Sequence, residues 1–411
     1  MLQSVFYGWW IVFAAFMISV YVGACTFFGF TAMFDPIVRE FGWSYAEVSF
    51  ASSLRGLEMG ILAPVVGVLV DRFGPRKILF VGIAATGIGF ILLSVTQSLW
   101  MFYASSLLIG FGAGGCTSVV TLAVIARWFR RNIGKAMGIT ASGFGASGLL
   151  VPVIVWLIDS FGWRSAVIVQ GVGMLVLGFP LALLVRNQPE EMGLSTDGIP
   201  PAGSGGGNAS GEPEHPDVQV PFRDAVKSRP FVYLNIVECL RFLAMTAVVV
   251  HVMPYLATKE VSRDIAGLVA AAIPLFSIPG RIGFGWMGDV VEKRYVIAIS
   301  LFCMAIGFFA FHFASALWPL VVFILLFAPG FGGNMVMRGA LIREYFGVLS
   351  FGKLTGITMG IGSLGGVFGP LIAGWIFDTY GTYDPIWIAV AATLFLTMFL
   401  ALRIRREDLS R

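Results

Sequence analysis

The stretch GVLVDRFGPRK at residues 67–77 returns, 218 positions along the chain, as GWMGDVVEKRY at residues 285–295. Both begin with glycine and carry an aspartate and an arginine at matching places. The same offset superposes further identities: Gly112, Gly114 and Gly115 on Gly330, Gly332 and Gly333, residues 138–140 on 356–358, Gly148 on Gly366, and Pro152 on Pro370. One constant offset over about 85 residues indicates two parallel copies of a single structural unit.

The composition indicates the solvent in which these copies fold. Of the 411 residues, 57% are apolar and 12% are charged, whereas a soluble domain carries about 25% charge. Segments of about 20 apolar residues are long enough to cross a bilayer. Twelve are expected, at residues 8–35, 45–70, 77–97, 100–126, 134–159, 164–186, 229–257, 264–288, 294–314, 317–341, 353–378 and 384–404. They predict an all-α membrane protein with twelve transmembrane helices in two pseudo-symmetric six-helix bundles.

A long polar stretch at residues 187–228 separates the sixth expected span from the seventh. Its glycines, prolines and acidic residues predict a flexible linker, with a short interfacial helix near residues 222–227. We therefore expect an N-terminal bundle at residues 1–186, a cytoplasmic linker at 187–228 and a C-terminal bundle at 229–411.

Basic residues in the short connections predict the orientation. The connections after spans two and four carry Arg72, Arg76, Lys77, Arg127, Arg130, Arg131 and Lys135, whereas residues 94–100, 312–318 and 378–385 contain neither Lys nor Arg. Basic loops stay on the cytoplasmic side. We expect a multi-pass protein of the cell inner (plasma) membrane, with both termini in the cytoplasm.

Several function classes are disfavoured. A net charge of +4 without a long basic run does not suit nucleic-acid binding. The four cysteines lie singly in apolar runs and never as a CxxC pair, which disfavours a disulfide framework and a zinc site. No metal or cofactor is expected. The glycines at 143, 145 and 148 lack the strand that a dinucleotide fingerprint needs and are interpreted as helix-packing positions. No catalytic motif is recognised, so an enzyme is not expected, and no obligatory protein partner is evident.

Ionisable residues inside the expected spans are functional candidates, because charge at membrane depth is costly. Arg55 with Glu58, and Glu238 with Arg241, are spaced i, i+3, so each pair can form on its own helix. Arg338 is expected near the cytoplasmic end of span ten, where it can reach the interface.

Arg281 differs from these because its neighbours at i−4 and i+4 are Ser277 and Gly285, neither of which is acidic. Its repeat mate is Ala63, so the two halves differ at this position. A guanidinium offers a planar fork of donors that matches a carboxylate. We expect Arg281 to bind an anionic substrate; the alternative is a structural ion pair with Glu238.

The repeated stretches resemble the cytoplasmic loop motif of the major facilitator superfamily. This resemblance implies the major facilitator fold and a gate at the cytoplasmic face, in which a carboxylate at a helix end pairs with nearby guanidinium groups. The residues concerned are Asp71, Arg72, Arg76, Asp289 and Arg294.

A narrower resemblance is to bacterial members of the monocarboxylate transporter family. It is carried by the sequence YGWW at residues 7–10 and by Trp128-Phe129-x-Arg131 with the glycines at 138 and 143, while the linker start at 187–194 is similar to oxalate–formate antiporter relatives. In that family an arginine of span eight is the substrate-anion ligand, which matches Arg281.

The same resemblance implies candidate residues for proton coupling and for the lining of the cavity. The family's lysine in span one and its aspartate before the span-eight arginine are replaced by Phe27 or Phe28 and by Ser277, so Glu238 and His251 remain as proton-coupling candidates. Asn334 is expected to face the cavity. Four further residues are expected to shape the pocket: Tyr21, Phe28, Cys116 and Ser142.

The resemblance implies a secondary active transporter that carries a small monocarboxylate, of the lactate or pyruvate class, together with a proton by alternating access. The alternative within transport is an antiporter of the oxalate–formate kind for organic anions. A membrane sensor that does not transport is a third hypothesis, from another functional class.

Overall fold

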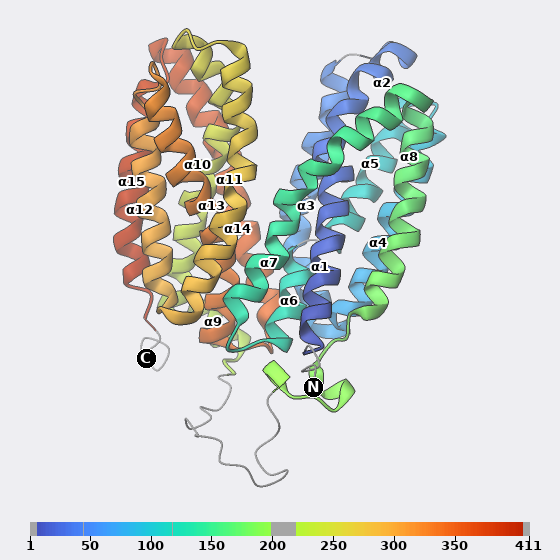
Figure 1. Ribbon diagram of the computed structural model, residues 1–411, viewed down its shortest axis with the longest axis vertical. Helices are drawn as coiled ribbons and strands as arrows, with labels where there is room; N and C mark the ends of the chain where they lie inside the picture. The colour runs from blue at the N-terminus through green and yellow to red at the C-terminus, as the bar shows by residue number, and fades with distance from the viewer. Residues whose placement is uncertain (1–5, 44, 117, 199–218, 406–411) are drawn as a thin grey trace, which may run out of the picture.

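The computed structural model describes residues 6–43, 45–116, 118–198 and 219–405. This described part is helical throughout and contains no strand. Figure 1 shows two bundles that approach each other at one end and diverge at the other. The N-terminal bundle contains α1 (Gly8–Val22), α2 (Phe34–Phe41), α3 (Tyr45–Phe73), α4 (Pro75–Ser94), α5 (Leu99–Gly114), α6 (Ser118–Trp128), α7 (Ile133–Ala146) and α8 (Val151–Leu184).

The C-terminal bundle follows the same order. It contains α10 (Arg229–Thr258), α11 (Arg263–Val290), α12 (Lys293–Phe311), α13 (Leu317–Phe346), α14 (Phe351–Tyr380) and α15 (Asp384–Leu402). The start of α1 and the end of α15 lie at the same end of the molecule as the described parts of the connection between the bundles, residues 187–198 and 219–228 (Figure 1). We call this the linker side.

The described helices accommodate the twelve expected spans. Ten segments are long and apolar enough to cross a membrane, and the longest of them, Ile133–Leu184, has 52 residues. It holds two spans, because Gly162 within α8 has a φ of +79° and turns the chain. The 29 residues of α3 supply the remaining span. The expected twelve-helix fold is confirmed.

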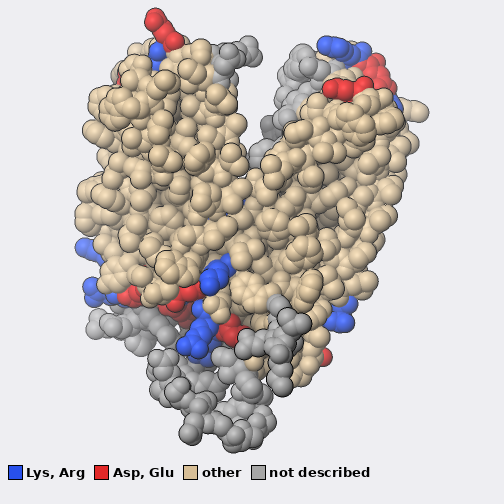
Figure 2. All heavy atoms as spheres, in the orientation of Figure 1, with Lys and Arg blue, Asp and Glu red and all other residues tan. Residues whose placement is uncertain are grey.

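The surface of the molecule suits a bilayer. In the view of Figure 2 the middle of the molecule is almost free of Lys, Arg, Asp and Glu, and these residues gather towards the two ends. A hollow separates the two bundles on the side opposite the linker (Figure 2). The two bundles therefore meet mainly on the linker side.

Glycines allow the two bundles to meet. A Cβ added at Gly134 of α7 would lie 2.1 Å from the carbonyl oxygen of Gly285 in α11, and one added at Gly67 of α3 would lie 2.1 Å from that of Gly352 in α14. The offset of 218 relates the first contact to the second. The α7–α11 and α3–α14 seams are therefore symmetry mates. Small residues let transmembrane backbones approach closely at both seams.

The glycines of span five pack against a neighbouring helix, as predicted. A Cβ added at Gly143 would lie 2.5 Å from the carbonyl oxygen of Phe16 in α1.

Span one is less regular than expected. After α1 the chain forms a π-helical turn at Gly23–Phe28 and a 3-10 turn at Gly29–Met33 before α2 begins. π-Helical turns inside α-helices are frequent at functional sites. Phe27 within the π-helical turn and Val22 directly before it line the cavity described below.

Two parts of the linker are described, residues 187–198 and 219–228. The first contacts the N-terminal bundle, where a carboxylate oxygen of Asp197 accepts the backbone N–H groups of Arg130 and Arg131 at 3.0 and 2.7 Å. The second contains α9 (Phe222–Lys227), at the place where a short helix was predicted. Residues 199–218 lie outside the described residues.

Candidate functional site

A cavity of about 470 Å³ lies between the two bundles. The N-terminal bundle contributes side chains from α1, α6 and α7, and the C-terminal bundle from α10, α11, α13 and α14. Most of the lining is aliphatic, aromatic or methionine. The polar lining groups are Ser19, Ser118, Thr121, Thr140, Arg241 and Arg281. The cavity therefore combines an apolar wall with two guanidinium groups, as expected for an organic anion site.

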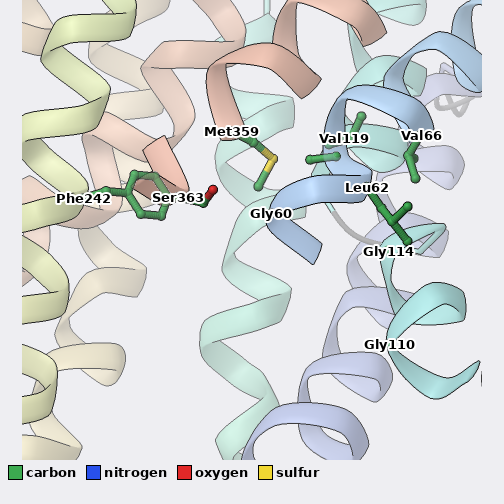
Figure 3. A pocket seen from close by; sticks show the side chains of 10 residues that line it. Gly60, Leu62, Val66, Gly110, Gly114, Val119, Phe242, Met359 and Ser363 are labelled. Atoms are coloured by element: carbon green, nitrogen blue, oxygen red, sulfur yellow. The ribbon is translucent and has the colours of Figure 1, made fainter. Parts of the chain in front are cut away.

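A smaller pocket of about 160 Å³ lies beside it, against α3 and α5 (Figure 3). Its lining is apolar apart from the hydroxyl of Ser363, and it shares Phe242 and Met359 with the larger cavity. No charged side chain lines this pocket among the described residues. We therefore place the candidate site in the larger cavity.

Arg281 lies in α11 and is 2% exposed. Its Nη1 crosses the seam and donates a hydrogen bond to the backbone carbonyl of Ala141 in α7, while its Nε has no partner. Among the residues that the structure describes, no carboxylate pairs with it. A buried guanidinium without a counter-charge is costly in the apolar interior, so Arg281 is the strongest candidate for an anion ligand.

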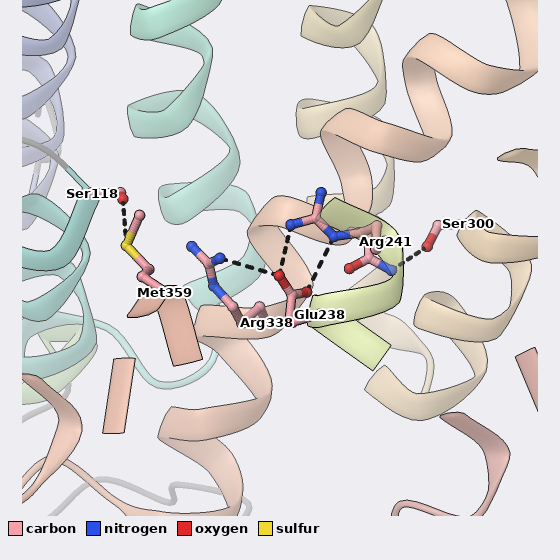
Figure 4. Close-up of polar contacts among 7 residues, drawn as sticks. Ser118, Glu238, Arg241, Ser300, Arg338 and Met359 are labelled. Atoms are coloured by element: carbon pink, nitrogen blue, oxygen red, sulfur yellow. Dashed lines mark hydrogen bonds and ion pairs between the residues drawn. The ribbon is translucent and has the colours of Figure 1, made fainter. Parts of the chain in front are cut away.

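Glu238 does not pair with Arg281. Its carboxylate accepts Nη2 of Arg241 at 2.6 Å and Nη1 of Arg338 at 3.2 Å (Figure 4). The predicted i, i+3 pair of Glu238 with Arg241 is confirmed, and the alternative partner for Arg281 is excluded in this structure.

Arg338 occupies a different place from the one predicted. Its side chain is 1% exposed and reaches into the bundle from α13 to Glu238 of α10, so the expectation that it extends to the interface is wrong. The paired carboxylate lies 100 residues away in the chain, and helical spacing around Arg338 gives no sign of it. The Arg55 side chain, and with it the expected pair with Glu58, lies outside the described residues.

Asn334 is buried but turned away from the cavity. Its Nδ2 donates to Oγ of Ser300 in α12 at 3.0 Å, and it is absent from the described cavity lining. The expectation that it faces the cavity is therefore wrong for this conformation, because the side chain satisfies its donor against the neighbouring helix.

Of the other expected pocket residues, some line the cavity and some have side chains bonded elsewhere. Cys116 lines the cavity. Tyr21 instead donates to the carbonyl of Gln170 in α8 at 2.9 Å, and Ser142 donates to the carbonyl one turn earlier in α7 at 2.7 Å. The side chain of Phe28 lies outside the described residues, whereas Phe27 lines the cavity.

His251 lies in α10 near the end opposite the linker side. Its Nδ1 is 3.1 Å from the hydroxyl of Tyr383, and its Nε2 is 3.1 Å from the carbonyl oxygen of Pro370. The neighbouring Val249 and Val252 line the cavity, but His251 is not among the described lining residues. Both ring nitrogens thus contribute to packing α10 against α14 and α15.

The predicted gate residues include two aspartates that hold the bundles together. Oδ1 and Oδ2 of Asp71 in α3 accept the backbone N–H groups of Gly352 and Lys353 at the start of α14, both at 2.9 Å. Asp289 of α11 accepts those of Gly134 and Lys135 at the start of α7, at 2.6 and 2.8 Å. Each aspartate thus caps a helix of the other bundle, where the helix dipole favours negative charge.

The arginines of the predicted gate act elsewhere. The guanidinium of Arg72 lies over the ring of Phe73 and that of Arg76 over the ring of Phe80, and Arg294 pairs with Glu292 at 2.8 Å. The expected pairing of aspartate with arginine is therefore wrong for this conformation. Backbone amides at the helix starts take the place of the guanidinium groups.

Sequence reasoning missed two contributions to the site. The backbone carbonyl of Ala141 carries no residue-type signal. Helical spacing predicts only a local pair with Glu238 for Arg241, yet Arg241 also lines the cavity. A usable signal exists, because the repeat mates of Glu238, Arg241 and Arg338 are Val20, Gly23 and Val120. The asymmetry that singled out Arg281 therefore applies to all three.

Comparisons with known proteins agree with this architecture. The family model described as Major Facilitator Superfamily matches residues 10–259 and 234–411. Monocarboxylate transporter 13 of Bos taurus is 27% identical over 397 residues, covering 94% of this chain and 87% of that protein. The uncharacterized MFS-type transporter YcxA of Bacillus subtilis (strain 168) is 26% identical over 361 residues, covering 84% and 83%.

Among solved structures, the human organic anion transporter MFSD10 (TETRAN) superposes with a TM-score of 0.72 at 14% identity, covering 96% of this chain and 99% of that one. At this identity the likeness shows the fold alone. The family match shows that this chain belongs to the major facilitator superfamily, and the sequence relatives show that it is homologous to the monocarboxylate transporters.

Proposed function

We propose that the protein carries a small carboxylate anion across the membrane, with Arg281 as the anion ligand. The observation that carries the proposal is the buried guanidinium of Arg281, which lines the cavity between the bundles and has no carboxylate partner among the described residues. A carboxylate can accept the two N–H groups of a guanidinium side by side. The names of the relatives, monocarboxylate transporters, support the same substrate class.

The transport cycle proposed is alternating access. In the described conformation the two aspartate caps close the linker side and the hollow opens opposite to it. The basic loops indicate that the linker and both termini lie on the cytoplasmic side of the plasma membrane. The hollow between the bundles then faces the outside of the cell in this conformation. The inward-facing state then requires both caps to break.

The first candidate for coupling is symport of a proton with a monocarboxylate of the lactate or pyruvate class. Glu238 is one of the two proton-coupling candidates, but its carboxylate is already paired with both Arg241 and Arg338. This arrangement favours the second candidate, exchange of one organic anion for another, in which no proton acceptor is needed. His251 remains a proton candidate at the far end of α10.

Flux in proteoliposomes tests the proposal. Labelled lactate or pyruvate uptake would be driven either by an inward proton gradient or by preloaded unlabelled anion. Symport predicts uptake that follows the proton gradient, and exchange predicts uptake that follows the internal anion. Arg281→Ala and Arg281→Lys should abolish uptake, while Arg403→Ala at the end of α15 is the control. Uptake retained in both Arg281 variants would refute the assigned ligand.

A further inference from the structure

The Glu238 cluster, formed by Glu238, Arg241 and Arg338, has one more positive than negative charge. One carboxylate faces two guanidinium groups at 2.6 and 3.2 Å. All three side chains are at most 1% exposed. Buried charges are normally paired, but among the described residues this cluster has two guanidinium groups for one carboxylate, so it carries a surplus positive charge next to the cavity.

The donors of the cluster are also in excess. Nη1 of Arg241 and both Nε and Nη2 of Arg338 are buried and have no hydrogen-bond partner. A buried donor without a partner costs about 1–3 kcal/mol, and more when it is charged. Surplus charge and surplus donors together indicate that an anionic group completes the cluster.

Only one of the two arginines reaches the cavity. Arg241 is a lining residue together with Arg281, whereas Arg338 is not among the described lining residues. The guanidinium carbon of Arg241 lies 4.6 Å from the ring centre of Phe242 and 5.8 Å from that of Phe331, which also line the cavity. The rings and Glu238 fix the guanidinium beside the cavity.

We propose that Arg241 is a second anion subsite and that the cargo is a dicarboxylate, with one carboxylate at Arg281 and the other at Arg241. The two arginines come from neighbouring helices, α11 and α10, and share one cavity of about 470 Å³. A dianion neutralises both the charge of Arg281 and the surplus charge of the Glu238 cluster. A monocarboxylate leaves one of them uncompensated. This inference rests on the proposed function, since it assigns the second end of an anion already held at Arg281.

The cluster offers a matched pair of variants. Arg241→Met and Arg338→Met each remove one positive charge, and each leaves Glu238 with one arginine. Both variants therefore keep a neutral buried pair, but only Arg241→Met removes a cavity-lining group. Arg241→Lys retains the charge at the site without the planar fork.

The test is equilibrium binding to purified protein of straight-chain dicarboxylates with two to six carbons and of monocarboxylates of equal length. The wild type should bind at least one dicarboxylate about tenfold more tightly than its monocarboxylate counterpart. Arg241→Met should lose this preference, while Arg338→Met and Arg241→Lys retain part of it.

Each of the other possible binding results contradicts one part of the proposal. Equal affinity for both acid classes in the wild type overturns the second subsite, whether or not the variants fold. Equal loss in Arg241→Met and Arg338→Met assigns the preference to overall charge and overturns the role of Arg241. Monocarboxylate binding that depends on Arg281 would leave the proposed function standing in both cases. If no acid of either class binds, the proposed function itself fails.

Discussion

Replacing either capping aspartate by asparagine should open the linker side of the carrier. In Asp71→Asn and in Asp289→Asn the side chain keeps one acceptor oxygen and loses its negative charge. Each aspartate accepts two backbone N–H groups, at 2.6–2.9 Å. Hydrogen bonds to charged groups contribute about 1.5–3 kcal/mol each, so we take about 2 kcal/mol as the loss per variant.

This loss falls on one conformation only, because the caps join the two bundles and must break when the linker side opens. A change of about 2 kcal/mol alters the ratio of open to closed molecules roughly 30-fold. The caps are symmetry mates on separate seams. The two single variants should therefore shift the ratio by similar factors, and the double variant should shift it by about the product of the two.

Distances between spin labels measure the ratio directly. One label at Arg130, beside the start of α7, and one at Val291, after the end of α11, report on the α7–α11 seam; both side chains are exposed. The native cysteines would be replaced beforehand. We expect a second, longer distance to gain population in both variants. Unchanged distances, or a response to Asp289→Asn but none to Asp71→Asn, would refute the reciprocal-cap argument.

Three further predictions concern stability and packing. Glu238→Gln leaves both cluster arginines without a carboxylate, so thermal unfolding in detergent should show a loss of about 3–5 kcal/mol; a loss below 1 kcal/mol would contradict the buried cluster. Gly134→Ala places a methyl group 2.1 Å from a backbone oxygen of the other bundle, and cross-linking across the α7–α11 seam should fall while each bundle stays helical by circular dichroism. Gly162→Ala meets no atom within 4 Å but must adopt a φ of +79° with a ψ of +157°, so it should lower stability by about 1–3 kcal/mol through backbone strain alone, and a change in transport at unchanged stability would argue against that cause.

The architecture could be predicted from the sequence because it depends on patterns that run along the whole chain. Twelve apolar segments and one constant offset of 218 residues specify the two bundles without reference to any single contact. The same offset relates the Asp71 and Asp289 caps, since the start of α7 and the start of α14 are repeat mates. The bonding partners of these aspartates were not predictable, because they are backbone amides of the opposite bundle.

The site was predictable only where local spacing carries information. Arg281 has no acidic neighbour within one turn, and among the described residues no carboxylate pairs with it. Arg338 finds its carboxylate on another helix, 100 residues away in the chain, which helical periodicity cannot indicate. Asn334 shows a further limit, since the direction of a buried amide depends on which neighbouring helix offers an acceptor, here Ser300.

On the proposed function, in which Arg281 binds an anionic cargo, its hydrogen bond to the carbonyl of Ala141 gives the empty carrier an internal competitor for that cargo. The competitor is a backbone oxygen. A side-chain substitution at position 141 therefore removes it only if the backbone geometry changes there. An arriving anion must displace a bond of about 1.5–3 kcal/mol, which lowers its apparent affinity by roughly ten- to a hundredfold. For a carrier this is useful, because a cargo that binds too tightly is not released, and the returning carbonyl helps to expel it.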